Sequence, residues 1–301
     1  MTKDVVVVGA GISGMSCAMY LEQAGLDVGV MGGPEGSQLA NAPVVRNYPG
    51  LPPMSGYELL EEFKSRLGDG VSWHEECISC NRVDEGSYSI EDGNGRKLSS
   101  RVVVIATGRR PRLLGIPGER ELLGNGLSTC AYCDGAFAEG GNVLVVGGGR
   151  VAFDSALYLS GLAHHVMVVM RGTGMRDSTW EDTLYRRGNV AFGRQSVPTS
   201  LSRTEDGKTC VSFDNRQAAM YDVVFYAIGS DASLGPLADL VEVDSDGIVA
   251  LDGGCQCGNG LYACGSVLSG FKVNQAVTAA ASGAACACQV VSDLRASGTS
   301  C

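Results

Sequence analysis

The stretch VVVVGAGISGMSCAMYLEQAG, residues 5–25, is repeated in outline by NVLVVGGGRVAFDSALYLSGLA, residues 142–163. Each copy predicts a short apolar strand, a glycine-rich turn and a helix in which Leu and Tyr recur at helical spacing. The turns fit the patterns G-x-G-x-x-G and G-x-G-x-x-A, which are informative when they follow a strand and open a helix. The positions that match are Gly9, Gly11 and Gly14 in the first copy and Gly147, Gly149 and Ala152 in the second.

Both turns have the same physical purpose. Glycines allow the backbone to turn tightly and to approach a pyrophosphate, which then rests on the exposed amides at the N-terminus of the helix. A single match would be weak, but two matched copies predict two dinucleotide sites and an α/β chain with two Rossmann-like three-layer domains.

Other segments indicate how the two domains are connected. A capping box from Ser55 to Glu58 predicts a helix that runs to about Leu67. Residues 101–108 and 221–229 each predict a buried strand that ends in a glycine turn, and we interpret them as the crossings between domains. From Gly260 onward, a strand, a loop and an Ala-rich helix are expected to complete the first domain. The predicted domains are 1–113 with 230–301, and an inserted domain over 114–229.

Composition excludes several classes of function. The chain has 301 residues and a net charge of −10, and it contains no run of Lys or Arg, so a nucleic-acid partner is not expected. The apolar run after Asp4 is too short for a signal peptide or a membrane span, which predicts a cytoplasmic protein. Twelve cysteines in such a chain are expected to be mostly reduced, so that any disulfide would be catalytic.

The segment STCAYCDGAF, residues 128–137, contains a Cys-x-x-Cys pair. This spacing allows Cys130 and Cys133 to form a small disulfide at a helix start, where the helix dipole stabilises a thiolate. Taken alone, the pair could also be half of a structural zinc site or two buried thiols. The neighbouring Asp134 could be an acid/base or merely a helix cap.

The order of these motifs resembles the pyridine-nucleotide-disulfide flavoproteins, and specifically the low-molecular-weight thioredoxin reductases. The resemblance extends from Val5 to about Val291 and includes GSQLANAPVVRNYPG, VVVIATG, STCAYCDGAF, GGGRVA, AIG, ACGSV and VNQA. It implies a homodimer with an FAD domain, residues 1–113 and 230–301, and an inserted NADPH-type domain that carries the Cys-x-x-Cys. The last histidine is His165, so the C-terminal acid/base histidine of the glutathione-reductase branch is missing.

The resemblance also implies roles for individual residues. Cys133 would be the sulfur next to the flavin, Cys130 the sulfur that exchanges with substrate, and Asp134 the acid/base. Met31 ends the second strand where an acid is usual, so Glu35 is the candidate for the ribose, and Ser266 stands where the family has Asp. The residues expected to bind FAD are Gly9, Gly11, Ser13, Gly14, Glu35, Gln38, Asn47, Thr107, Gly108, Gly265, Ser266, Gln275 and Ala276.

The predicted NADPH site is incomplete. The family binds the 2′-phosphate with a His-Arg-Arg-x-x-x-Arg run, which Met170, Arg171, Gly172 and Arg176 retain only in part. NADPH binding by Gly147, Gly149, Ala152, Arg171 and Arg176 is therefore a weakened expectation. A protein of this fold without NADPH can run as an FAD-dependent dithiol oxidase, and the chain also resembles the bacterial oxidases that close disulfides in natural products such as romidepsin and holomycin.

Three functions follow from these patterns. The preferred one is oxidation of a small-molecule dithiol with electrons passing to FAD and then to oxygen. The alternative is an NADPH-dependent reductase of a thioredoxin-like protein, and a catalytically silent flavin-binding regulator is a third reading that the intact Cys130, Cys133 and Asp134 oppose. No metal site is predicted. Cys77 and Cys80 are interpreted as structural thiols. Another five cysteines could form a relay or a metal site but are interpreted as core or surface thiols: Cys255, Cys257, Cys286, Cys288 and Cys301.

Overall fold

The first glycine-rich repeat forms β1 (Thr2–Val8) and α1 (Ile12–Gln23), and the second forms β9 (Asn142–Val146) and α5 (Arg150–Leu159). Gly9 has a φ of +113°, and a Cβ there would lie 2.5 Å from the carbonyl oxygen of Ala106. Gly147 has a φ of +146°, and its Cβ would lie 2.4 Å from the carbonyl oxygen of Ala227. Only glycine fits either turn, which explains why both copies keep it.

The computed structural model describes residues 1–84, 86–251, 254–271 and 273–296. The chain divides into unit 1, Met1–Arg110 with Asp231–Cys301, and unit 2, Pro111–Ser230. The chain crosses between the units within β7 (Arg109–Pro111) and β16 (Ser230–Ala232), two short strands that pair with each other. The second unit is thus inserted into the first.

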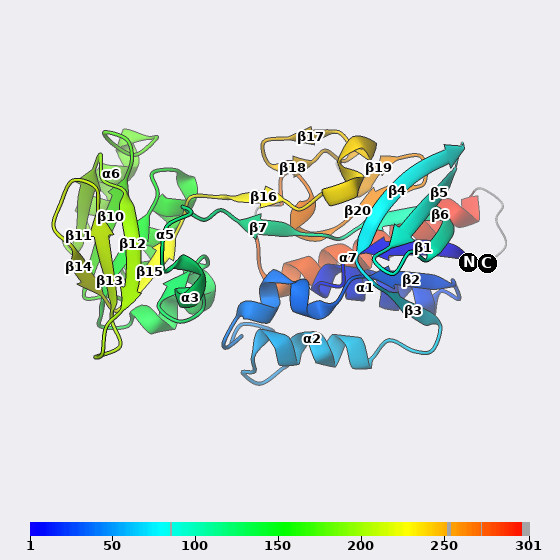
Figure 1. Cartoon of the computed structure of the whole chain (residues 1–301), viewed down its shortest axis with the longest axis horizontal. Coiled ribbons are helices and arrows are strands. Elements are labelled where there is room, and N and C mark those ends of the chain that lie inside the picture. Colours follow the sequence, from blue (N-terminus) through cyan, green and yellow to red (C-terminus); the bar gives the residue numbers. More distant parts are fainter. Residues whose placement is uncertain (85, 252–253, 272, 297–301) are drawn as a thin grey trace. The chain divides into compact units, whose positions relative to one another are not determined.

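Unit 1 is built on an eight-stranded sheet with a parallel centre (Figure 1). The strand order is β19-β20-β6-β1-β2-β3, and β5 joins β4 to β6 in antiparallel pairing. The described part of this unit contains three α-helices, namely α1, α2 and α7. The bounds are β2 Val28–Met31, β3 Val71–His74, β4 Cys77–Asp84, β5 Ser87–Asp92, β6 Lys97–Ile105, β17 Val243–Asp244, β18 Gly247–Ile248, β19 Gln256–Gly258, β20 Leu261–Ala263, α2 Gly56–Ser65 and α7 Ala276–Ala296.

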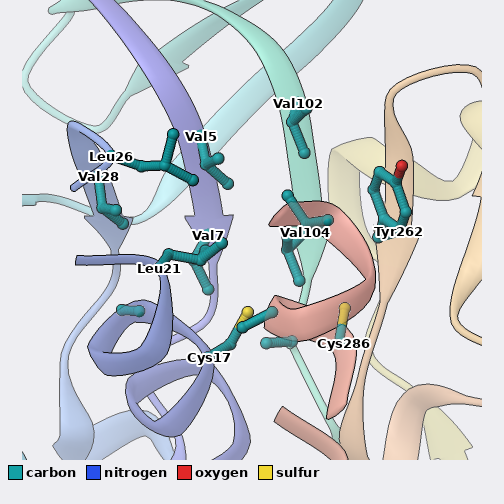
Figure 2. Packing of buried hydrophobic residues seen from close by; sticks show 14 of the residues in the cluster. Val5, Val7, Cys17, Leu21, Leu26, Val28, Val102, Val104, Tyr262 and Cys286 are labelled. Carbon is teal, nitrogen blue, oxygen red and sulfur yellow. The ribbon is translucent and has the colours of Figure 1, made fainter. Parts of the chain in front are cut away.

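The core of unit 1 lies between the central strands and the helices α1 and α7, which are side by side (Figures 1 and 2). The hydroxyl of Ser16 on α1 donates a buried hydrogen bond of 2.8 Å to the carbonyl oxygen of Ala280 on α7. By length and composition α7 could also span a membrane. However, Ala287 and Val290 on this helix are fully buried against the valines of the sheet, so α7 is the core helix that the sequence predicted.

Unit 2 contains a five-stranded parallel sheet of order β11-β10-β9-β15-β8 and a three-stranded antiparallel sheet of order β12-β13-β14. The valines of β9 and β15 are buried on both faces, as is usual in parallel sheets. The bounds are β8 Leu127–Ser128, β10 His165–Met170, β11 Val190–Arg194, β12 Pro198–Arg203, β13 Thr209–Phe213, β14 Ala219–Tyr221, β15 Val223–Tyr226, α3 Glu119–Leu122, α4 Ala131–Asp134 and α6 Ser178–Tyr185.

The capping box of α2 is present, since Ser55 and Glu58 bond each other's backbone amides. The helix nevertheless ends at Ser65 rather than at the predicted Leu67, because Gly68 and Gly70 turn the chain and donate their amides to the carboxylate of Glu22. Cys77 and Cys80 lie on β4 as buried residues, and burial raises the pKa of Cys77 to about 11 and that of Cys80 to about 12. Their interpretation as structural thiols agrees with this placement.

Candidate functional site

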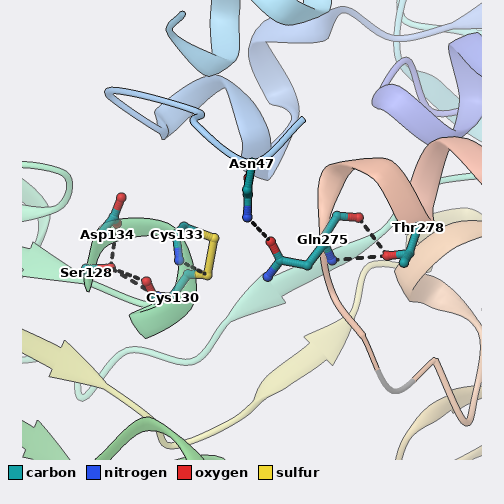
Figure 3. Close-up of a disulfide and its surroundings, with 7 residues drawn as sticks. All are labelled: Asn47, Ser128, Cys130, Cys133, Asp134, Gln275 and Thr278. Atoms are coloured by element: carbon teal, nitrogen blue, oxygen red, sulfur yellow. Dashed lines mark hydrogen bonds between the residues drawn. A yellow bond between two sulfur atoms is a disulfide. The ribbon is translucent and has the colours of Figure 1, made fainter. Parts of the chain in front are cut away.

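The Cys-x-x-Cys pair lies where β8 ends and α4 begins, within unit 2 (Figure 3). Cys130 and Cys133 form a disulfide with a Cα–Cα distance of 5.3 Å. Cys130 is the N-cap residue of α4, and its Sγ accepts a hydrogen bond of 3.2 Å from the amide of Cys133. After reduction, the same amide could stabilise a thiolate at Cys130. Cys130 is half-buried, whereas Cys133 is exposed on the surface of the unit.

Ser128 connects the disulfide loop to Asp134. Its hydroxyl accepts a hydrogen bond of 3.0 Å from the amide of Cys130 and donates one of 2.6 Å to Oδ2 of Asp134 (Figure 3). Ser128 itself is buried. The sequence interpretation missed this residue, although its place two residues before Cys130 is a signal that could have identified it.

The carboxyl group of Asp134 does not cap the turn of helix that follows it. Its side chain makes no capping hydrogen bond to the following turn of 3-10 helix, residues 135–138, and Oδ1 is buried without a hydrogen-bond partner among the residues that the structure describes. Burial raises the pKa of Asp134, and the hydrogen bond from Ser128 opposes this effect. Asp134 also borders a cavity of about 210 Å³ that is lined by Ser128, Arg203 and Asp222. These features favour the acid/base interpretation of Asp134.

The predicted FAD residues lie in unit 1 in six separate segments. Gly11 is the N-cap residue of α1. As a glycine it has no side chain that could cap the helix, and the first turn of this helix carries no acid. Its free amides are therefore available to a phosphate group. Ser13 and Gly14 lie in this turn, and Glu35 and Gln38 lie in two short 3-10 helices after β2. Asn47 lies in the loop before α2, and Thr107 and Gly108 follow β6. Gly265 and Ser266 lie in a 3-10 helix after β20, and Gln275 and Ala276 lie at the start of α7.

The fold brings several of these residues together. The side-chain amide of Asn47 donates a hydrogen bond of 2.7 Å to Oε1 of Gln275, which is 228 positions away in the chain (Figure 3). A Cβ on Gly108 would lie 3.5 Å from the hydroxyl oxygen of Ser266. Glu35 borders a cavity of about 350 Å³ next to the carboxyl ends of β2 and β3, where Rossmann domains hold the ribose of a dinucleotide.

The hydroxyl of Thr107 is a further sign of a bound group. Its oxygen is buried and has no hydrogen-bond partner among the described residues, and such atoms usually serve a ligand or water. Together with the uncapped start of α1 and the cavity beside Glu35, it fits a dinucleotide such as FAD. Thr107 would then contact the bound FAD, and the turn at Gly9 would hold its pyrophosphate.

Replacing Thr107 by valine should weaken FAD binding about tenfold, because one hydrogen bond of about 1.4 kcal/mol is lost. The melting temperature of the apoprotein should not fall, since the hydroxyl has no protein partner to lose. Titration of apoprotein with FAD by fluorescence, combined with thermal melting, measures both. The S196A variant is the control, because it removes another buried hydroxyl without a partner, in unit 2. Equal FAD affinity of T107V and wild type would contradict this prediction.

The predicted NADPH residues lie around the carboxyl ends of β9 and β10. Gly147 and Gly149 form the turn before α5, and Ala152 is fully buried in that helix. Arg171 and Arg176 are exposed and lie on the loop that follows β10. Within the described ranges, no side-chain hydrogen bond or ion pair holds either guanidinium in place. The turn is therefore complete, whereas only two exposed arginines remain of the run that the family uses for the 2′-phosphate.

Comparisons with known proteins agree with this architecture. Residues 3–283 match the model of the family described as pyridine nucleotide-disulphide oxidoreductase. A bifunctional thioredoxin reductase/thioredoxin of Mycobacterium leprae is 31% identical over 94% of this chain, which spans 64% of that relative. The crystal structure of thioredoxin reductase from Streptococcus pyogenes superposes with a TM-score of 0.86, at 28% identity over 98% of this chain and 99% of the other.

A second solved structure, that of HlmI, has a TM-score of 0.80 and 26% identity over 99% of this chain and 96% of its own. The family match covers most of the chain, and the similarity in fold includes both units. The chain therefore belongs to the pyridine nucleotide-disulphide oxidoreductase family, as a thioredoxin-reductase-like flavoprotein oxidoreductase whose cofactor is FAD.

Proposed function

We propose that the protein is a dithiol oxidase that closes a disulfide in a small-molecule dithiol, of the kind found in natural products. The observation that carries this proposal is the Cys130–Cys133 disulfide beside the half-buried Asp134, in a unit that keeps only two of the three arginines of the family's NADPH motif. Cys130, Cys133 and Asp134 would be the catalytic residues. We further propose that the enzyme works in the cytoplasm as a homodimer, as the resemblance implies.

The reaction needs two exchanges of sulfur bonds. One thiolate of the substrate attacks Sγ of Cys130, breaks the Cys130–Cys133 bond and releases Cys133 as a thiolate. The carboxylate of Asp134 takes the proton of the second substrate thiol, which then attacks the first substrate sulfur and releases Cys130. The substrate leaves as a disulfide after losing two electrons and two protons, and the two cysteines carry the electrons.

Recovery of the disulfide requires an electron acceptor. The residues around the turn at Gly9 would hold FAD, which would supply the route by which two electrons and two protons pass from the cysteines to oxygen and yield hydrogen peroxide. On the protein side, the thiolates of Cys130 and Cys133 join again as these electrons leave. Ser128 keeps the carboxyl of Asp134 beside the loop throughout, through its hydrogen bond of 2.6 Å.

The direction of electron flow is argued from the NADPH side. A 2′-phosphate dianion is bound best by guanidinium groups in a fixed, paired geometry. Here Gly172 stands where the family has the second arginine of its run, so that only the exposed Arg171 and Arg176 remain. At the start of α5, Arg150 is paired with Asp154 at 2.8 Å. The similarity to HlmI, a protein of the same fold, is compatible with this proposal.

The second candidate is an NADPH-dependent reductase of a thioredoxin-like protein. The complete turn at Gly147 and Gly149 favours it, because this turn could still receive a pyrophosphate. Arg171 and Arg176 could also move toward a 2′-phosphate, since no bond restrains them. Two relatives in the comparisons are named thioredoxin reductases. The third reading, a silent flavin-binding regulator, would leave the arrangement of Ser128, Cys130, Cys133 and Asp134 without a purpose.

One experiment separates the two enzymes. The purified holoprotein is mixed with excess NADPH without oxygen while the flavin absorbance is followed. We expect an unchanged spectrum with NADPH, then bleaching with a small dithiol and recovery of the absorbance in air. Rapid bleaching by NADPH would overturn the oxidase and establish the reductase. Hydrogen peroxide produced in equal amount to the dithiol consumed provides an independent measure of oxidase turnover.

A further inference from the structure

Cysteines from separate parts of the sequence meet in the core of unit 1. Cys17 lies on α1, Cys264 follows β20 and Cys286 lies on α7, and their three sulfur atoms are all within 4.8 Å of one another. All three side chains are fully buried. Figure 2 shows Cys17 and Cys286 on the two neighbouring helices, below the valines of the sheet.

A fourth cysteine borders this group. Cys255 precedes β19, is half-buried and packs against the buried core cluster that contains Cys17, Cys264 and Cys286. Its backbone is fixed as well, because its carbonyl oxygen accepts a hydrogen bond of 2.8 Å from the amide of Ala263. We name Cys17, Cys255, Cys264 and Cys286 the four-cysteine cluster. Its members come from two helices and two strand ends, so that the complete fold is needed to assemble it.

The spacing of the sulfur atoms suits one metal ion. Zinc binds thiolates at about 2.3 Å, so the sulfurs of a tetrahedral site lie roughly 3.8 Å apart. The three buried sulfurs are already within 4.8 Å of one another, and small side-chain rotations would bring them to bonding distance. Four cysteine ligands without room for water are typical of structural rather than catalytic zinc.

We propose that the four-cysteine cluster binds one Zn²⁺ ion, which joins α1, α7 and the strand end at Cys264 into one structural centre. Each thiol that becomes a ligand releases its proton to water, and no electron is transferred. Cys264 directly precedes Gly265, a predicted FAD residue, so the ion would also fix the start of that segment. This site is separate from the disulfide, and its existence does not depend on the direction of electron flow.

The first test is the metal content of the wild-type holoprotein. Protein produced in zinc-supplemented medium and dialysed against a weak chelator should keep about one zinc per chain. Replacement of zinc by Co²⁺ should produce the visible bands of tetrahedral cobalt thiolate, at wavelengths beyond the flavin absorbance. Zinc below roughly a tenth of an ion per chain, together with no cobalt bands, would overturn the proposal. A disulfide within the cluster, found by mass spectrometry, would overturn it too.

Two variants on one helix locate the site. C286S removes a ligand and should lose the zinc, whereas C288S changes an exposed cysteine two residues further along α7 and should keep it. If C286S does not fold, C255S replaces it, because Cys255 lies at the edge of the core and its loss leaves the buried packing intact. Equal zinc content in C288S and in the folded ligand variant would contradict the assignment.

Discussion

Serine at Cys133 should lower dithiol oxidation at least roughly a thousandfold, because the disulfide that receives the substrate's electrons can no longer form. The oxygen of serine cannot replace sulfur in this exchange, and Cys130 would remain as a single thiol. Binding of FAD should be unchanged, since the predicted FAD residues all lie in unit 1, whereas Cys133 lies in unit 2. Steady-state oxidation of a small dithiol, measured through hydrogen peroxide, and the flavin-to-protein ratio test both statements.

The C130S variant should lose as much activity, and comparison of the two variants tests the roles of the sulfurs. If Cys133 is the sulfur next to the flavin, its free thiolate in C130S should add a long-wavelength absorbance band that C133S lacks. The control is C210S, on β13 of the same unit, which should oxidise dithiols at the wild-type rate. More than a tenth of wild-type activity in C133S would remove Cys133 from the reaction.

The two dinucleotide turns could be predicted from the sequence because their physics is local. A strand, a turn that only glycine can adopt and a helix of small residues occupy about twenty neighbouring positions, and Gly9 and Gly147 have the required geometry. The capping box at Ser55 is local in the same sense. The family resemblance added the pairing of Asn47 with Gln275 in one site, which no local pattern could indicate.

Long-range groupings were beyond sequence reasoning. Cys17 and Cys264 were not considered in the sequence analysis and were not connected with Cys286, because nothing in their spacing shows that α1, β20 and α7 meet. Of the cysteines that the sequence analysis interpreted as core or surface thiols, Cys301 lies outside the described residues. Ser128 was missed for another reason: a hydroxyl becomes important only once the fold buries a carboxyl beside it. Residues of this kind acquire their function from burial, which depends on tertiary structure.

Asparagine at Asp134 should lower the turnover number about a hundredfold, which is typical for loss of a general base, while the disulfide still forms. The amide cannot accept the proton of the second substrate thiol, so the exchange would depend on hydroxide or water. Because burial raises the pKa of Asp134, the wild-type rate should fall on the acidic side at a higher pH than for an ordinary aspartate. D134N should lose this acidic limb, and pH–rate profiles of both proteins would show it.

The same raised pKa predicts that D134N is more stable than wild type at neutral pH. A carboxyl whose folded-state pKa exceeds its unfolded value loses stabilisation as the pH rises through the folded pKa, so the neutral-pH penalty disappears with asparagine. The melting temperatures of D134N and wild type should converge below the pKa of unfolded aspartate.

The S128A variant is the matched companion of D134N in the pH–rate measurement. It removes the hydrogen bond that lowers the pKa of Asp134, so the acidic limb of its pH–rate profile should move to higher pH with the base still present. An unshifted limb in S128A, or an unchanged rate in D134N, would show that the proton leaves by another route.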